Sequence, residues 1–169
     1  MKAVFDSTPL ILLAKISKFE LLKKLFSEIH IPRQVYDDVV VMGKGKPGEK
    51  ELKAAKGNWI NVDTVFHRGA VEKIKGTYKL HPGESEAIVL ASELKAKFFF
   101  TDDESARKAA ISVFENTGTE ISGTIGILDF GKKAGLISKQ EYKDSIRLLK
   151  ERGYYLSEKL YQKILKQED

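Results

Sequence analysis

The chain has 169 residues, within the usual range for one domain, and it has no cysteine, which excludes disulfides, thiol nucleophiles and cysteine-ligated zinc. Its net charge of +5 favours contact with polyanions such as nucleic acid, although ordinary solubility explains the same charge. No apolar run reaches roughly 18 residues and the N-terminus has no secretory pattern, so we expect a soluble, cytoplasmic protein without a membrane partner.

The first elements alternate between strand and helix. A strand at 3–5 leads into a helix that Thr8 can cap and Pro9 can begin. An apolar stripe predicts a second helix near 19–26, and a short strand follows at 29–31. This alternation is typical of a sheet built from strand–helix–strand units.

A third helix follows the second strand. Val35, Val39 and Met42 recur at helical spacing and predict its apolar face, with Asp38 at the edge of that face. Residues 43–48 are rich in glycine and lysine and predict an exposed loop, without the spacing of a nucleotide-binding glycine motif.

The middle of the chain is less regular. Residues 59–62 predict a strand, and 64–80 have no period to which we assign an element. The break at 81–83 precedes an amphipathic helix that carries Ala87 and Leu90 on its apolar face.

The remaining strands complete an α/β pattern. Three phenylalanines at 98–100 predict a strand, a helix follows over about 106–113, and 120–123 predict a last short strand. The alternation predicts an α/β fold with a mostly parallel central sheet and helices on both faces.

Two further helices are expected at the C-terminal end. Ser138 and Glu141 have the spacing of a capping box, and Ser157 begins a final helix. No linker or repeat separates these helices from the rest. We therefore predict a single domain over 1–169, with about 138–169 as an elaboration of it.

Acidic residues follow two of the predicted strands. Asp6 ends the first strand, and Asp102 and Asp103 follow the triple-phenylalanine strand. In an open α/β sheet, functional residues gather at the carboxyl ends of strands, and clustered carboxylates repel one another unless a divalent cation is present. The pattern indicates a metal-dependent site, although each acid alone is equally explained as a helix cap or a solvated side chain.

Either of two glutamates in the helix after residue 81 is a candidate for that site, but not both. Glu84 and Glu86 are two residues apart, so on a helix they point roughly 200° away from each other. Glu86 lies beside Ala87 on the buried stripe, whereas Glu84 suits the first turn of the helix. We therefore predict that Glu86 joins Asp6, Asp38 and the Asp102–Asp103 pair.

Several basic residues are candidates for contact with a substrate phosphate, but each has an equally simple structural explanation. Arg107 lies one helical turn after Asp103 and would contact a substrate phosphate or pair with Asp103, of which the ion pair is favoured. Lysines in the loop and at a later helix end are candidate phosphate contacts or solvated side chains; they are Lys44, Lys46, Lys132 and Lys133.

Four segments together resemble the PIN-domain family of metal-dependent ribonucleases, in particular a branch of VapC-like toxins. They are Val4–Ile11, Ile31–Val39, Gly83–Ala91 and Phe100–Arg107. The resemblance extends over nearly the whole chain. It implies a PIN-like three-layer sandwich, with Mg²⁺ or Mn²⁺ as cofactor and RNA as substrate.

The resemblance also implies roles for individual residues. The catalytic acids would be Asp6, Asp38, Glu86 and Asp103, with Asp102 able to share or replace the role of Asp103, and the metal ligands would be Asp6, Glu86 and Asp103. Thr101 would help to order the site and, with Arg107, contact the substrate. Many relatives have Glu at the position of Asp38 and Asp at the position of Glu86, which preserves charge but changes reach.

The predicted function is a divalent-metal-dependent endoribonuclease that cleaves single-stranded RNA and is the toxin of a toxin–antitoxin pair. An antitoxin protein and a second copy of the chain, forming a homodimer, are the implied partners. The alternative is a non-catalytic PIN-like module that binds RNA or protein. A nuclease that prefers DNA is a third possibility, because no feature of the sequence reads the 2′-hydroxyl.

Overall fold

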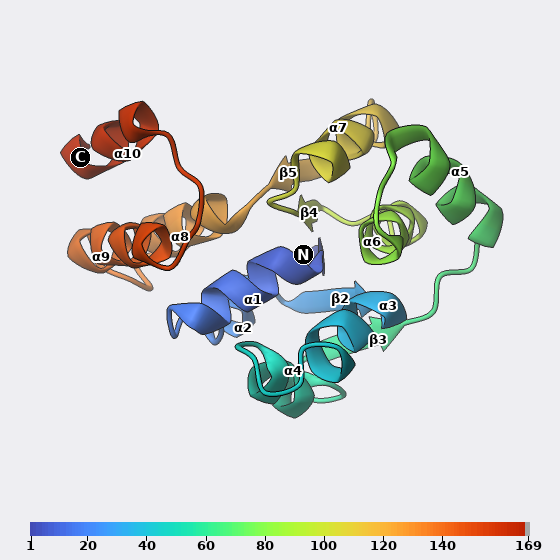
Figure 1. The fold of residues 1–169 in the computed structure, drawn as a ribbon, viewed down its shortest axis with the longest axis horizontal. Helices are drawn as coiled ribbons and strands as arrows, with labels where there is room; N and C mark the ends of the chain where they lie inside the picture. The colour runs from blue at the N-terminus through green and yellow to red at the C-terminus, as the bar shows by residue number, and fades with distance from the viewer. Residues whose placement is uncertain (168–169) are drawn as a thin grey trace.

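A single five-stranded parallel sheet lies at the centre of the structure, a computed structural model that describes residues 1–167 (Figure 1). The strands lie in the order β3-β2-β1-β4-β5 and all neighbours run parallel. Their bounds are β1 (Lys2–Phe5), β2 (Glu28–Pro32), β3 (Ile60–Asp63), β4 (Phe98–Phe100) and β5 (Glu120–Ser122). The predicted α/β fold is confirmed, and all five strands end at the same edge of the sheet.

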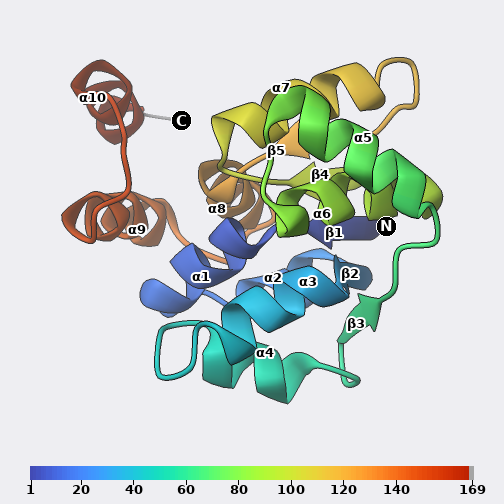
Figure 2. The ribbon, with the colours of Figure 1, turned by 45° about the vertical axis from the view of Figure 1, so that its right-hand side comes forward.

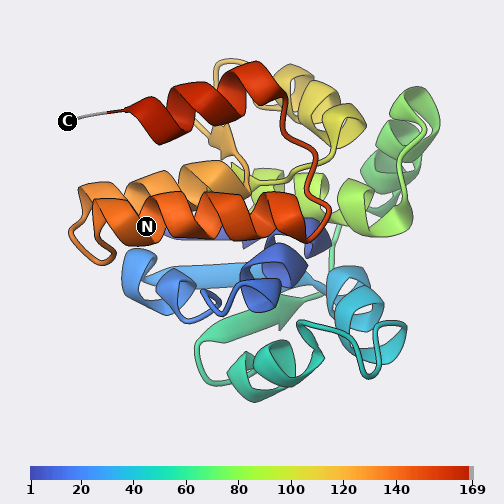
Figure 3. The same ribbon diagram turned by 60° about the vertical axis from the view of Figure 1, so that its left-hand side comes forward.

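Helices cover both faces of this sheet and make the predicted three-layer sandwich. On one face α6 contacts β1, β2 and β4, with α5 and α7 packed against α6 (Figure 2). On the other face α8 contacts β5 and lies against α1, α2 and α9 (Figure 3). The helices are α1 (Ser7–Lys15), α2 (Leu21–Leu25), α3 (Arg33–Tyr36), α4 (Glu49–Ala55), α5 (Arg68–Tyr78), α6 (Pro82–Glu93), α7 (Glu104–Val113), α8 (Thr124–Lys133), α9 (Lys139–Glu151) and α10 (Glu158–Lys166).

The triple-phenylalanine strand shows how the sequence fills both faces. Side chains alternate along a strand, so Phe98 and Phe100 point to one face, where their rings lie 5.6 and 6.3 Å from that of Phe130 in α8. Phe99 points to the other face, where its ring lies 5.6 Å from that of Phe114 after α7. All three strand residues are buried, as expected for a strand covered on both sides.

The third helix differs from the prediction. After α3 the chain continues as a single π-helical stretch, η1 (Asp37–Val41), closed by a hydrogen bond from the Met42 amide to the Asp37 carbonyl. A π turn is wider than an α turn and rotates the residues that follow it. Val40 is therefore buried and Met42, predicted on the apolar face, is 76% exposed.

Helices α5 and α8 lie where the sequence analysis assigned no element. α5 occupies most of 64–80; only Val71 of this helix is fully buried, and Gly69 and Gly76 weaken its helical pattern. α8 carries Ile127 and Leu128 into the core. Among residues 1–167, no helix combines the length and apolarity needed to cross a membrane.

Candidate active site

Asp6 is a buried carboxylate at the end of β1 and the start of α1. Its Oδ1 accepts a hydrogen bond from the Ser7 amide at 2.7 Å, and its Oδ2 accepts one from the Thr101 hydroxyl at 3.0 Å. Burial, with smaller contributions from the negative charges of Glu84 and Asp103, raises the pKa of Asp6 to about 6 against these two bonds. Asp6, rather than Thr8, is thus the cap of α1.

Thr101 lies beneath two of the predicted acids. Its side chain is fully buried; its hydroxyl donates to Asp6 and accepts a hydrogen bond from the Asp103 amide at 3.1 Å. Asp103 then caps α7 by accepting from the Ala106 amide at 2.7 Å. One hydroxyl therefore orders the acids that follow β1 and β4, which supports the ordering role expected of Thr101 and leaves none of its surface for a substrate.

Glu84 in the first turn of α6 faces the same region. Its Oε2 accepts a hydrogen bond from the His81 amide at 2.9 Å, which makes it part of the cap of α6. Its half-buried position raises the pKa of its carboxyl, and the charges of Asp103 and Asp38 add to the rise. The charges of Asp6, Asp38, Glu84 and Asp103 therefore act on one another, and we call these four residues the acid group.

Asp38 reaches this group from the π turn. Its Oδ1 accepts a hydrogen bond from the Gln34 side chain at 2.9 Å, and its Oδ2 lies against Gly83, where an added Cβ would be only 2.6 Å away. The start of α6 can approach Asp38 this closely because Gly83 has no side chain. The sequence analysis gave no role to Gly83.

Glu86, chosen from the sequence, has a different partner. Its buried carboxylate accepts a hydrogen bond from the Arg68 guanidinium at 2.7 Å and so joins α6 to α5. It is not among the charges that shift Asp6 or Glu84. Two helical positions separate it from Glu84, and it is Glu84 that faces the other acids.

Asp102 and Asp103 also point to different neighbours. Asp102 accepts hydrogen bonds from the amide and hydroxyl of Thr124, at 3.0 and 2.6 Å, and from the Tyr154 hydroxyl at 3.1 Å. Burial and the charge of Asp102 raise the pKa of Tyr154, so its hydroxyl stays a donor at neutral pH. Asp102 therefore holds the start of α8 and the chain after α9.

No ion pair neutralises the acid group within the described residues. Within residues 1–167, no Lys, Arg or His forms an ion pair with its four carboxylates. Such a set of hard oxygen donors fits a divalent cation in charge and ligand type. However, no three acidic or histidine side chains in the described part of the chain are arranged to hold one metal ion.

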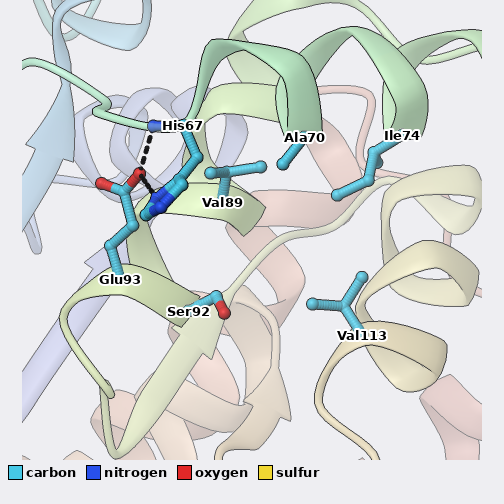
Figure 4. A pocket seen from close by; sticks show the side chains of 7 residues that line it. All are labelled: His67, Ala70, Ile74, Val89, Ser92, Glu93 and Val113. Atoms are coloured by element: carbon cyan, nitrogen blue, oxygen red, sulfur yellow. Dashed lines mark hydrogen bonds and ion pairs between the residues drawn. The ribbon is translucent and has the colours of Figure 1, made fainter.

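A separate cavity of about 270 Å³ lies between α5, α6 and α7 (Figure 4). Its one ionic feature is Glu93, which accepts hydrogen bonds from the backbone amide of His67 at 2.7 Å and from its ring at 2.9 Å. Glu93 also accepts from the Phe66 amide, so it fastens the start of α5 to α6. The rest of the lining is mainly apolar, and none of the acid group lines it.

The fold and these contacts define an α/β protein with carboxylates gathered where the central strands of a parallel sheet end. A family model described as a PIN domain (DUF3368) matches residues 2–169, and the chain therefore belongs to the PIN-domain family. The match includes α9 and α10. PIN domains are generally nucleases and generally use divalent metals. No curated protein and no solved structure shows significant similarity to the chain.

Proposed function

We propose that the protein is a divalent-metal-dependent endoribonuclease that cleaves single-stranded RNA at the acid group. The observation that carries the proposal is electrostatic. Burial, together with smaller contributions from neighbouring carboxylates, raises the pKa of Asp6 to about 6 and that of Glu84 above its usual range, and no ion pair with a described residue neutralises the acid group. Such an arrangement costs stability and is typical of a functional site.

Asp6, Glu84 and Asp103, with Asp38 beside them, are the residues that would hold Mg²⁺ or Mn²⁺. When bound, the metal would polarise the phosphodiester and lower the pKa of a water. Other residues of the protein orient these acids. The Thr101 hydroxyl bonds both the Asp6 carboxylate and the Asp103 amide, and the Gln34 side chain donates to one oxygen of Asp38. Because the acids are not preformed at ligand distances, their side chains must approach one another to share an ion.

The toxin role rests on the resemblance to VapC-like proteins. We include in the proposal a cytoplasmic location, an antitoxin partner and a homodimer. A single domain over the whole chain, with the C-terminal helices as part of it, is also proposed; buried residues of α9 and α10, such as Ile146 and Ile164, support it because they belong to the same apolar core as the sheet.

One observation favours the alternative of a non-catalytic PIN-like module. The absence of a preformed metal-binding group among residues 1–167 is what such a module would show. The two functions differ in their dependence on the acids, because a binding module would tolerate neutral replacements that leave the fold intact.

The matched glutamates of α6 provide the test. We expect Glu84→Gln to reduce Mn²⁺-dependent cleavage of a labelled single-stranded RNA by roughly a hundredfold or more, because it removes a ligand of the metal. Glu86→Gln changes the same side chain two residues away and should retain cleavage, with a loss of stability of about 1–3 kcal/mol from the weakened contact with Arg68. Cleavage in the wild type that is unaffected by EDTA, or retained in folded Glu84→Gln, would refute the proposal.

A further inference from the structure

A second cleft lies beside the acid group. It has a volume of about 360 Å³ and opens where β4 and β5 end. Its lining includes Asp102 after β4, Ser122 and Gly123 at the end of β5, Arg107 of α7, and Tyr155 and Leu160 near the C-terminal end. The acid group occupies the same edge of the sheet one strand away, because β4 lies between β1 and β5.

Consecutive residues connect the two sites. Asp103 belongs to the acid group, whereas Asp102 lines the cleft. Arg107 is one helical turn further on, its amide donating to the Asp103 carbonyl at 2.9 Å. A chain of nucleotides that passes the acid group along this edge would therefore meet the cleft next.

Arg107 offers an unused positive charge to this cleft. The expected ion pair with Asp103 is not formed, and within residues 1–167 the guanidinium has no carboxylate partner. The side chain is exposed, and its positive charge partly opposes the rise in the pKa of Tyr154, which places it near that ring. An exposed guanidinium that faces a cleft suits a phosphate, which it can bind through two parallel hydrogen bonds.

Tyr155 offers an aromatic face to the same cleft. It lies in the segment that joins α9 to α10, visible in Figure 3, and is 88% exposed. Its neighbours are fixed: the Tyr154 hydroxyl donates to Asp102, Leu156 is buried in the core, and the Ser157 hydroxyl accepts from the Leu160 amide at 3.2 Å. The backbone that carries the exposed ring is thus anchored on both sides, which lowers the entropy lost when a base stacks on it.

We propose that this cleft binds a nucleotide of the single-stranded RNA next to the scissile phosphate, with Arg107 on the phosphate and the ring of Tyr155 stacked on the base. The inference rests on the proposed nuclease function and adds a substrate subsite to it. Stacking on an aromatic ring tolerates any base, so the subsite holds the strand without reading its sequence. A protein partner is the less favoured occupant, because the cleft lies at the same edge of the sheet as the acid group and is lined by Arg107, whose guanidinium has no carboxylate partner among the described residues.

The experiment measures binding of fluorescein-labelled oligouridylate by fluorescence anisotropy in EDTA, where metal-dependent cleavage does not interfere. Tyr155→Ala should weaken binding by about 5- to 100-fold, the range for loss of one stacked base, and Tyr155→Phe should restore it. Arg107→Gln should weaken binding and reduce the salt dependence by about one phosphate contact. Phe66→Ala, which removes another exposed aromatic ring (82% exposed), and Lys108→Gln, which removes a neighbouring charge on α7, lie outside the cleft and should bind like the wild type.

Each other outcome overturns the inference. If Tyr155→Ala and Arg107→Gln bind as tightly as the two controls while the wild type still cleaves RNA, the cleft is not a subsite and the nuclease proposal stands. If the wild type neither binds nor cleaves RNA, both proposals fail. If Tyr155→Ala leaves RNA binding unchanged but alters the oligomeric state in sedimentation, the cleft is a protein interface.

Discussion

Asp6 is the residue at which stability and function oppose each other most directly. It is almost completely buried and lies near two other carboxylates, and its pKa of about 6 lies above the value of 3.8 expected of an unperturbed aspartate. The folded protein therefore binds a proton at Asp6 more readily than the unfolded chain does. Ionising this residue at neutral pH costs the folded state up to about 3 kcal/mol.

The first prediction concerns Asp6→Asn in metal-free protein. The unfolding free energy of the wild type should decrease as pH rises from about 4 to 6, because the folded state retains a proton that the unfolded state has released. Asn keeps an acceptor for the Ser7 amide and cannot ionise, so the variant should lose this pH dependence and gain about 1–3 kcal/mol at pH 7. Urea unfolding in EDTA at several pH values measures both effects.

Asp129 provides a control of opposite sign. Hydrogen bonds and charges from Lys133 and Lys132 lower its pKa despite partial burial, so its contribution to stability is present at neutral pH and is lost as pH falls through its folded pKa. Asp129→Asn should therefore lower stability at pH 7. If Asp6→Asn also lowers it, or keeps the wild-type pH dependence, the electrostatic account of Asp6 is wrong.

At the scale of elements, the close contact between η1 and α6 positions Asp38. The Gly83→Ala variant tests this contact, because the added Cβ would lie 2.6 Å from Asp38 Oδ2. The flexible carboxylate can move, so the protein should fold with little change in melting temperature. Displacing a metal ligand by about 1 Å should reduce cleavage roughly 10- to 100-fold.

Gly76→Ala is the matched control for this contact. Gly76 is also helical, and an added Cβ there meets no atom within 4 Å. It should raise the unfolding free energy by up to about 1 kcal/mol and leave cleavage unchanged. Equal cleavage in both variants would show that Asp38 does not depend on Gly83 for its position.

Helix starts were predicted correctly where the signal lies in neighbouring residues that bond to each other. The capping box of α9 is present as expected, with Ser138 and Glu141 each accepting a hydrogen bond from the backbone amide of the other. Ser157 likewise begins α10. The π turn was not predictable, because an inserted residue changes the phase of a helix without a sequence signal, and Met42 was assigned to the wrong face for this reason.

At the scale of the whole molecule, the sequence predicted which strand ends and helices carry the acids better than it predicted which of the acids lie close together. The positions of Asp6 and Asp103 follow from strands whose carboxyl ends share an edge, a property of any parallel sheet. Glu84 was not chosen because the position of each glutamate was judged against the buried stripe of the helix, whereas the first turn of α6 lies close to Asp38. That relation depends on the packing of α3 against α6, which no local pattern contains.

The choice between Asp102 and Asp103 also depends on long-range structure, and it leads to the final prediction. Asp102 joins the end of β4 to Thr124 of α8 and to Tyr154 beyond α9, so it connects the C-terminal helices to the sheet. Without metal, Asp102→Asn should lower the unfolding free energy by about 1–2 kcal/mol, because Asn lacks the second acceptor oxygen. Asp103→Asn should cost little, since Asn also caps helices and the substitution removes repulsion.

Adding Mn²⁺ should reverse the ranking of the two variants. A ligand that binds only the folded state raises the melting temperature by mass action, so the wild type and Asp102→Asn should both gain stability with increasing Mn²⁺. Asp103→Asn should gain far less, because it has lost a carboxylate of the acid group. Thermal melts with and without Mn²⁺ separate the two roles. If the stabilisation by Mn²⁺ disappears in Asp102→Asn and persists in Asp103→Asn, the metal binds at Asp102, on the cleft side of β4. This result would contradict a metal site at Asp103, the residue whose charge acts on Asp6 and Glu84.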